Sequence, residues 1–237
     1  MHRKWEVASL HFSNIGRGVY TLAEASLLTG VNRHRISRWT RGYTFSYRGS
    51  RQTMPAIIGR ELEVLESPIL TFADLIEIRF LDAFRCEGVS SKALRIASQR
   101  AKEYLGRHHP FSTQIFKSDG RTILAEITKE TGDKVFLDIV NNQYVFENVI
   151  GSYLYSGLDF NDLKEPARWW PIGRDRAVVI DPRRSFGAPI VTKGGIPTKI
   201  LNSAVNAEKS IEFVAKWYGV DVNEVKDAVQ FESKQAA

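Results

Sequence analysis

The chain has 237 residues, of which 43% are hydrophobic and 25% are charged. At roughly 100–200 residues per domain, this length corresponds to one large domain or a few small ones, and the apolar fraction excludes a wholly disordered chain. No stretch approaches the ~18 apolar residues of a membrane-spanning helix, and the charged first residues lack the apolar core of a secretion signal. The single cysteine, Cys86, excludes an internal disulfide. We therefore expect a cytoplasmic protein.

The positive charge is concentrated at the start of the chain. The net charge is +6, and residues 1–60 contain ten Lys and Arg against two Asp and Glu, whereas the remaining residues contain 23 against 25. All of the positive excess therefore lies in the first quarter of the sequence. Such asymmetry favours contact with a polyanion, most often nucleic acid, although a merely solvated basic face is the simpler alternative.

Two short helices are predicted in this basic segment. Thr21 to Glu24 form a capping box, and Gly30 is suited to ending the helix that follows. Asn32 is an N-cap candidate for a second, arginine-rich helix over residues 33–39, whose Ile36 and Trp39 are expected to face inward. Two helices joined by a tight glycine turn, the second one basic, are typical of a helix-turn-helix that binds DNA.

A β-hairpin is predicted to follow. The alternation of residues 43–47 predicts a strand, residues 48–51 a turn, and residues 54–58 a return strand, which together make a wing beside the second helix. Side chains of the second helix and of the wing would reach phosphates or base edges, and this binding should weaken steeply with salt. The residues that we expect to contact DNA are Arg33, His34, Arg35, Ser37, Arg38, Arg41, Arg48 and Arg51.

This part of the sequence resembles a MerR-like winged helix. The matching residues are Tyr20-Thr21-Leu22-Ala23-Glu24-Ala25, Leu28-Thr29-Gly30-Val31, Arg35-Ile36 and Trp39. The resemblance covers about residues 18–105. It implies a winged helix-turn-helix domain completed by two more helices, and the sequence supplies start signals for both at Thr71 and Ser90.

The middle of the chain is predicted to form a small antiparallel sheet. Residues 114–116 and 122–127 flank the turn signal Ser118-Asp119-Gly120, and residues 135–139 and 143–146 flank Asn141-Asn142, so two hairpins are expected. The pair His108-His109 lacks partners with metal-ligand spacing. Neither a phosphate-binding glycine loop nor a nucleophile elbow is present. We therefore expect no metal, no cofactor and no catalytic site.

The last part of the chain is predicted to be mainly helical. A short strand is expected at residues 178–180, and three helices are expected to start at Pro197, Ser210 and Asp221. The last helix is expected to expose more acids than bases, which would repel DNA phosphates and favours a protein partner or dimer contact. Its expected exposed charges are Asp221, Glu224, Asp227 and Glu232 against Lys226 and Lys234.

Residues 176–232 resemble a C-terminal domain that is associated with VapB-like antitoxins. The resemblance lies in Val178-Val179-Ile180-Asp181-Pro182-Arg183-Arg184-Ser185-Phe186-Gly187-Ala188-Pro189-Ile190-Val191, Gly195-Ile196-Pro197-Thr198, Val214-Ala215-Lys216-Trp217-Tyr218 and Asn223-Glu224-Val225. Lys193-Gly194-Gly195 departs from the Gly-Thr-Arg that is more usual before Ile-Pro. The resemblance implies a type II antitoxin that neutralises a PIN-like ribonuclease toxin, and Arg183, Arg184 and Lys193 are the candidates for entering the acidic nuclease site.

The expected fold is α+β and mainly α, with a winged helix-turn-helix over residues 1–107, a small antiparallel sheet and connector over 108–165, and a C-terminal three-helix bundle over 166–237. The expected function is that of a homodimeric antitoxin which binds operator DNA, represses its own operon and is not an enzyme. The alternative is a MerR-like regulator whose C-terminal part senses a small ligand. The aromatic residues that would line its pocket are Trp169, Trp170, Trp217 and Tyr218.

Overall fold

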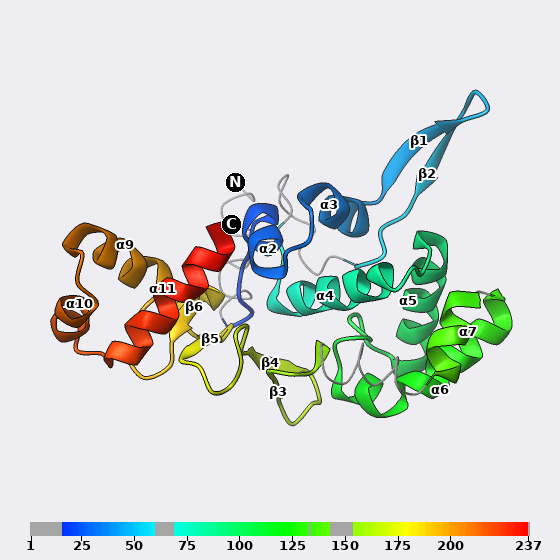
Figure 1. Ribbon diagram of the computed structural model, residues 1–237. Helices are drawn as coiled ribbons and strands as arrows, with labels where there is room; N and C mark the ends of the chain where they lie inside the picture. The colour runs from blue at the N-terminus through cyan, green and yellow to red at the C-terminus, as the bar shows by residue number, and fades with distance from the viewer. Residues whose placement is uncertain (1–15, 60–68, 133, 143–153, 237) are drawn as a thin grey trace, which may run out of the picture. The chain divides into compact units, whose positions relative to one another are not determined.

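The computed structural model describes residues 16–59, 69–132, 134–142 and 154–236, and it is α+β and mainly helical. The described residues form two compact units. The N-terminal unit comprises those in 20–156 and 160–166, and the C-terminal unit comprises those in 16–19, 157–159 and 167–236 (Figure 1). Within the described residues, no helix has the length and apolarity to cross a membrane. The expected domain boundaries at 107 and 165 stay predictions.

The first two predicted helices are present. Helix α2 spans Leu22–Thr29, and Thr21 and Glu24 form the capping box in both directions. Gly30 ends the helix in the left-handed conformation, with φ 75°. Asn32 then caps α3, Arg33–Arg41, by accepting a hydrogen bond from the amide of His34 at 2.9 Å. Local capping therefore fixes both helices and the short turn between them.

The hairpin is present, but its return strand was predicted in the wrong place. Strand β1, Tyr43–Tyr47, pairs with β2, which spans Ser50–Met54 and not residues 54–58. The turn consists of Arg48 and Gly49 alone, and both have positive φ, as the two-residue type I′ turn requires. Residues 57 and 58 are instead buried, and their amides donate to the carbonyl oxygen of Trp39 at 2.7 and 3.0 Å.

Helices α4, Phe72–Cys86, and α5, Ser91–Leu105, begin at the predicted caps. Thr71 and Asp74 form a complete capping box, and the Ser90 hydroxyl accepts a hydrogen bond from the amide of Ala93. Helix α4 is buried along most of its length, so it is the central helix of the N-terminal unit.

The first predicted hairpin of the middle region is wrong. Residues 114–131 form one helix, α6 (Gln114–Thr131), which Thr113 caps through the amide of Phe116. Gly120 is not a turn residue: a Cβ there would lie 2.9–3.1 Å from the Phe116 ring, so the glycine lets that ring pack against the helix. The buried side chains Phe116, Ile123, Leu124 and Ile127 have helical spacing. The turn signal Ser118-Asp119-Gly120 was overridden by this packing.

The second predicted hairpin is also wrong for the part that is described. Residues 134–141 form helix α7 (Lys134–Asn141), which buries Phe136, Ile139 and Val140 on one face. The expected return strand at 143–146 lies outside the described residues. Helices α6 and α7 pack against each other, so in the described part of this region a helical pair replaces the expected sheet.

Aromatic rings form the core that joins these helices. The ring of Phe84 on α4 lies 5.6 Å from that of Phe111 and 5.9 Å from that of Phe136, and Phe111 lies 5.0 Å from Phe116, all with edge-to-face geometry. All four rings are fully buried. Such pairs add to the free energy gained from area burial alone, so the region after α5 is an integral part of the N-terminal unit.

Beside this core lies a buried carboxylate, that of Glu77 on α4. It accepts hydrogen bonds from the amides of Phe111 and Ser112 at 3.4 and 3.0 Å. Burial raises the pKa of Glu77 to about 7, and the opposing influence of His109, of the two amides and of Lys102 does not cancel that effect. Close by, His109 contacts Asp74 at 2.7 Å.

Glu77 makes the stability of the chain depend on pH. Between pH 4.5 and about pH 7 the folded chain keeps a proton that the unfolded chain has lost, so the free energy of unfolding should fall as pH rises through this window. Glu77→Gln should flatten that slope, as measured by urea denaturation at pH 5 and pH 8. Glu126→Gln, an exposed position on α6, controls for loss of a charge. Identical slopes in wild type and Glu77→Gln would contradict the assignment.

The C-terminal unit combines a small sheet with three helices. Strands β3 (Leu158–Phe160) and β4 (Pro166–Trp169), most of whose residues belong to this unit, are followed in the sheet by β5 (Val178–Ile180) and β6 (Pro189–Val191). A short 3-10 helix, η2 (Ser185–Gly187), connects β5 to β6. The helices are α9 (Thr198–Glu208), α10 (Ile211–Tyr218) and α11 (Val222–Ala236), close to the predicted starts. Helices α9 and α11 also contact β6.

Candidate nucleic-acid interface

Helix α3 presents a polar, cationic stripe to solvent. Ile36, Trp39 and Thr40 are buried, which turns the opposite side of the helix outward. His34, Ser37, Arg38 and Arg41 follow the i, i+3, i+4, i+7 spacing of one helix face, and we call these four residues the α3 stripe. Ser37 is half-buried and the other three are exposed. No acidic residue occurs in α3.

The remaining two arginines of α3 flank this stripe. Arg33 is exposed at the start of the helix. Arg35 is also exposed, but its guanidinium forms an ion pair with Asp82 of α4 at 2.5 Å. This pairing was not predicted from sequence, because Asp82 lies 47 residues away along the chain. It holds Arg35 at the edge of the stripe and offsets part of its charge.

The arginines of the hairpin lie at different places along it. Arg48 occupies the turn, with its guanidinium 5.4 Å from the centre of the Tyr47 ring. Arg51 lies on β2 opposite Ser46 and not in the turn, because the return strand starts earlier than predicted. Both are exposed. Figure 1 shows the hairpin projecting from the C-terminal end of α3.

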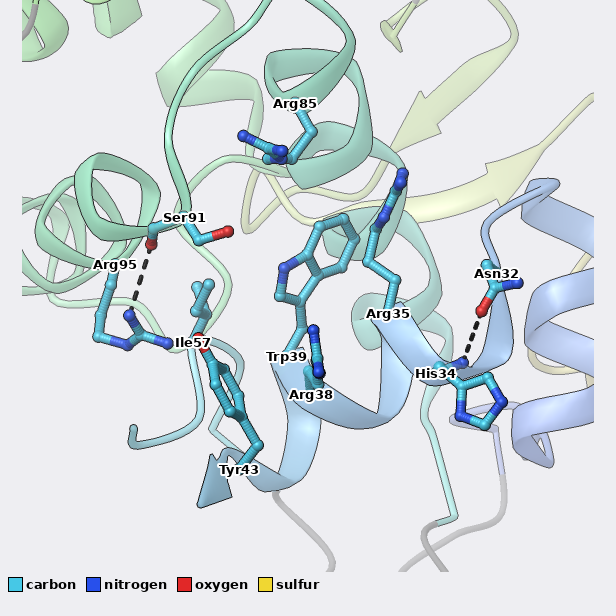
Figure 2. Close-up of a pocket in the computed structure, with 10 residues that line it drawn as sticks. All are labelled: Asn32, His34, Arg35, Arg38, Trp39, Tyr43, Ile57, Arg85, Ser91 and Arg95. Atoms are coloured by element: carbon cyan, nitrogen blue, oxygen red, sulfur yellow. Dashed lines mark hydrogen bonds between the residues drawn. The ribbon is translucent and has the colours of Figure 1, made fainter. Parts of the chain in front are cut away.

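A cleft of about 420 Å³ opens beside α3, and sequence reasoning missed it. Ten residues line it; four are arginines and none is acidic. Arg35 and Arg38 come from α3, whereas Arg85 comes from the end of α4 and Arg95 from the first turns of α5 (Figure 2). We call this the arginine cleft. The sequence alone suggests only a solubilising role for Arg95, because no sequence signal near it indicates that α5 packs beside α3.

The arginine cleft has an apolar floor. Trp39 and Ile57 are both buried there, and the hydrogen bond between the Ile57 amide and the Trp39 carbonyl joins them. Arg38 lies over the Tyr43 ring, with its guanidinium carbon 4.8 Å from the ring centre. The cleft therefore combines cationic and apolar lining residues.

In the C-terminal unit, two of the three candidate residues for toxin binding are brought together. Arg184 donates to the carbonyl oxygen of Thr192 at 3.4 Å, and its guanidinium lies against Gly195. Lys193 sits in the same turn, with an exposed side chain. Arg183 is exposed and lies next to Gly16.

Of the four acids that were predicted to be exposed at the last helix, two are buried. Glu224 is buried and accepts hydrogen bonds from the amides of Lys193 and Asp221 at 2.7 and 3.3 Å. Asp227 is buried and bonds the Ala177 amide and the Arg176 guanidinium. Because these acids tie neighbouring loops to α11, they do not form the repulsive surface that the sequence suggested.

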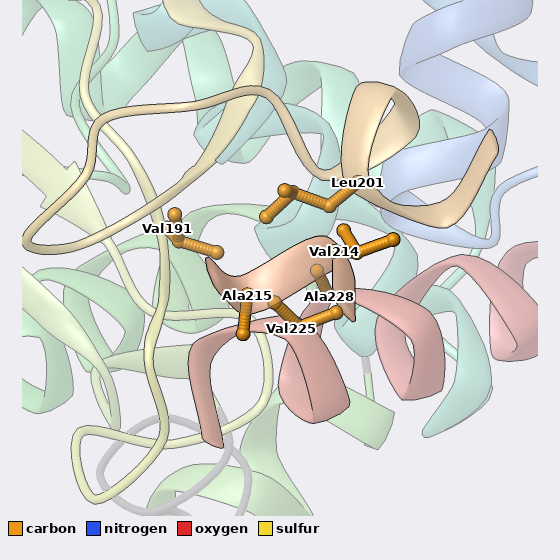
Figure 3. Packing of buried hydrophobic residues seen from close by; sticks show 6 residues of the cluster. All are labelled: Val191, Leu201, Val214, Ala215, Val225 and Ala228. Carbon is orange, nitrogen blue, oxygen red and sulfur yellow. The ribbon is translucent and has the colours of Figure 1, made fainter. Parts of the chain in front are cut away.

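An apolar cluster holds the Lys193 turn and the three helices of the C-terminal unit together. Val191 of β6 packs with side chains of all three helices of the unit, as Figure 3 shows. The other buried members are Leu201, Val214, Ala215, Val225 and Ala228. The turn with Lys193 follows Val191 directly, so it is attached to a packed core and not to a free loop.

The aromatic residues expected to line a ligand pocket lie in different settings. Trp169 is buried in the sheet opposite Ile180, whereas Trp217 is 65% exposed on α10. The Trp170 indole donates to Asp159 at 3.1 Å. In the part of the chain that the structure describes, no group of three His, Cys, Asp or Glu side chains is placed to hold a metal ion.

Comparison with known proteins finds similarity in both sequence and structure. No family model matches the chain. The chain is 28% identical over 225 residues to "Putative antitoxin VapB45" of Mycobacterium tuberculosis, and the match covers 89% of this chain and 92% of that protein. The structure of the present chain is similar to the crystal structure of Rv2018 from Mycobacterium tuberculosis, with a TM-score of 0.67 and 24% identity. The match covers 89% of this chain and 96% of the Rv2018 chain. The structural similarity shows a shared fold.

Proposed function

We propose that this protein is the antitoxin of a type II toxin–antitoxin system, and that it binds operator DNA through a MerR-like winged helix-turn-helix. The observation that carries the DNA-binding part is the α3 stripe, an outward face that carries cations on a helix without acidic residues. The similarity to a protein named as an antitoxin, over nearly all of both chains, supports the antitoxin part.

In this proposal α3 is the recognition helix and the hairpin is the wing. Arg33, Arg38 and Arg41 have the charge and length to reach phosphates or guanine edges, and Ser37 donates to either. Arg48 at the turn is suited to contact the neighbouring backbone. Because helix-turn-helix proteins usually read paired half-sites, we propose that the protein binds its operator as a homodimer.

The C-terminal unit would neutralise a PIN-like ribonuclease toxin. Such nucleases gather carboxylates around a divalent cation, so an inserted guanidinium or ammonium group would occupy the site electrostatically. The candidates are Arg183, Arg184 and Lys193, and the attachment of the Lys193 turn to the buried Glu224 supports the idea of a preformed contact.

RNA cleavage tests this proposal directly. The chain is added to the purified product of the neighbouring reading frame, which this proposal expects to be a PIN-like ribonuclease, and cleavage of an RNA substrate should stop at equimolar chain. Arg184→Glu with Lys193→Glu should restore cleavage, with a loss of binding free energy on the order of 2–5 kcal/mol if the cations enter the nuclease site. Lys226→Glu, an exposed reversal on α11, is the matched control. Undiminished cleavage with the wild-type chain would refute the antitoxin role.

A further inference from the structure

The arginine cleft holds more positive charge than the described residues around it neutralise. Among its four arginines, Arg35 is paired with Asp82. Arg85 and Arg95 contact neutral groups: Arg85 donates to the Val89 carbonyl at 2.5 Å, and Arg95 donates to the carbonyls of Pro55 and Ser91 at 3.2 and 3.5 Å. These contacts orient the guanidinium groups without compensating their charge.

Each of these arginines keeps the capacity to bind an anion. A guanidinium carries five N–H groups, of which the contacts above use one in Arg85 and two in Arg95. Oriented guanidinium groups with remaining donors are the usual receptors for phosphate, because the planar fork matches two phosphate oxygens.

The start of α5 adds a second, independent attraction for an anion. Ser91, its first residue, lines the cleft, and α5 is 15 residues long. The first amide groups of a helix have no intrahelical acceptor, and the helix dipole places partial positive charge at this end. In Figure 2 the start of α5 and the α3 arginines border the same opening.

We infer that the arginine cleft binds a nucleotide phosphate, and that its source is the backbone of the DNA duplex bound by α3. The inference rests on the proposed function and extends it to residues outside α3 and the hairpin. The cleft shares His34 and Arg38 with the α3 stripe, so in this inference a strand whose bases meet the stripe would place its backbone over the cleft. The apolar floor of Trp39 and Ile57 suits the deoxyribose beside that phosphate.

This assignment gives Arg85 and Arg95 a role different from that of the α3 stripe. They would contact the backbone and fix the position of the duplex, so their loss should weaken all sequences about equally. Each phosphate contact contributes a slope of about 0.9 to the fall of log K with log salt concentration. Arg85→Gln and Arg95→Gln should therefore each reduce that slope by about 1.

Fluorescence anisotropy measures this with the full chain and two labelled duplexes, one from the promoter of its own operon and one scrambled. Both glutamine variants should lower affinity for the two duplexes by the same factor, whereas Arg85→Lys and Arg95→Lys should keep the salt slope. Arg100→Gln on α5, whose side chain is paired with Glu103, is the control and should change nothing. If Arg85→Gln fails to fold, the affinity and salt slope of the Arg95 variants are sufficient to test the inference.

A modified duplex locates the phosphate. Neutral methylphosphonate groups are introduced one at a time along the promoter duplex. At one position, the substitution should weaken binding by wild type but leave binding by Arg95→Gln unchanged. If every position weakens both proteins equally, Arg95 touches no phosphate and the inference is overturned.

The remaining outcomes separate this inference from the proposed function. If wild type fails to bind either duplex at low salt, the proposed DNA binding itself fails. If wild type binds and both glutamine variants keep its salt slope, only the cleft inference fails. Isothermal titration with deoxyadenosine monophosphate tests the other source: micromolar binding that Arg95→Gln abolishes, with an unchanged salt slope on DNA, would assign the cleft to a small phosphorylated ligand. Absence of such binding supports the duplex.

Discussion

Gly42→Ala should be among the most destabilising single substitutions in the chain, and it should abolish DNA binding. Gly42 joins α3 to β1 with φ 73° and ψ −172°, a region that is essentially restricted to glycine. A Cβ there would lie 2.3 Å from the carbonyl oxygen of Met54 and 3.0 Å from the carbonyl carbon of Pro55, both of them backbone atoms that cannot move alone. Strain and clash together should cost about 3–5 kcal/mol of the free energy of unfolding.

Gly49→Ala is the matched control for this prediction. Gly49 also has positive φ, at 78°, but a Cβ there would meet nothing within 4 Å. Gly49→Ala should lower the free energy of unfolding by only roughly 1–2 kcal/mol, which is the cost of placing a non-glycine residue in the left-handed conformation. Chemical denaturation and anisotropy with the promoter duplex measure both variants. Equal losses of stability would show that the junction between α3 and the hairpin is not specially constrained.

Arg38→Ala should weaken binding to the promoter duplex by about 1–3 kcal/mol, the range for an arginine that reads a base edge. Arg38 belongs to the α3 stripe and is positioned over Tyr43 without an acidic partner among the described residues. Inhibition of the toxin should be unchanged, because the residues proposed for that contact belong to the C-terminal unit.

The comparison with Arg35→Ala distinguishes an arginine that is proposed to contact base edges from one that forms an ion pair within the protein. Arg35→Ala also removes a cation, but one that Asp82 already holds at 2.5 Å, so its effect should be the smaller of the two. Asp82→Asn should then increase affinity for both promoter and scrambled duplexes, because it releases the charge of Arg35. If Arg38→Ala reduces DNA binding and toxin inhibition equally, the residue is structural and the proposed assignment fails.

Prediction from sequence succeeded where the signal is local. The caps at Thr21, Asn32, Thr71 and Ser90 identified the starts of four helices, since a capping side chain and the amide it bonds are only two or three residues apart. The outward face of α3 followed from the inward positions of Ile36 and Trp39.

Prediction from sequence failed where contacts between residues far apart in the chain determine the local structure. Gly120 resembles a turn residue in sequence, but in α6 it makes room for the Phe116 ring. A closer reading of the spacing in residues 116–127 would have favoured the helix, together with the Thr113 cap. The arginine cleft had no such signal, because Arg85 and Arg95 reach α3 only through the packing of α4 and α5. The burial of Glu224 likewise depends on a loop 31 residues earlier.

The hairpin consists of ten paired residues, and none of them is buried. With no apolar side anchored in a core, its shape depends on the backbone ladder and on the two-residue turn. Such a ribbon opens at low energetic cost in the free protein. In the proposed complex with DNA, part of the binding free energy would be spent on immobilising the hairpin, so a more rigid two-residue turn should strengthen the hold on the operator.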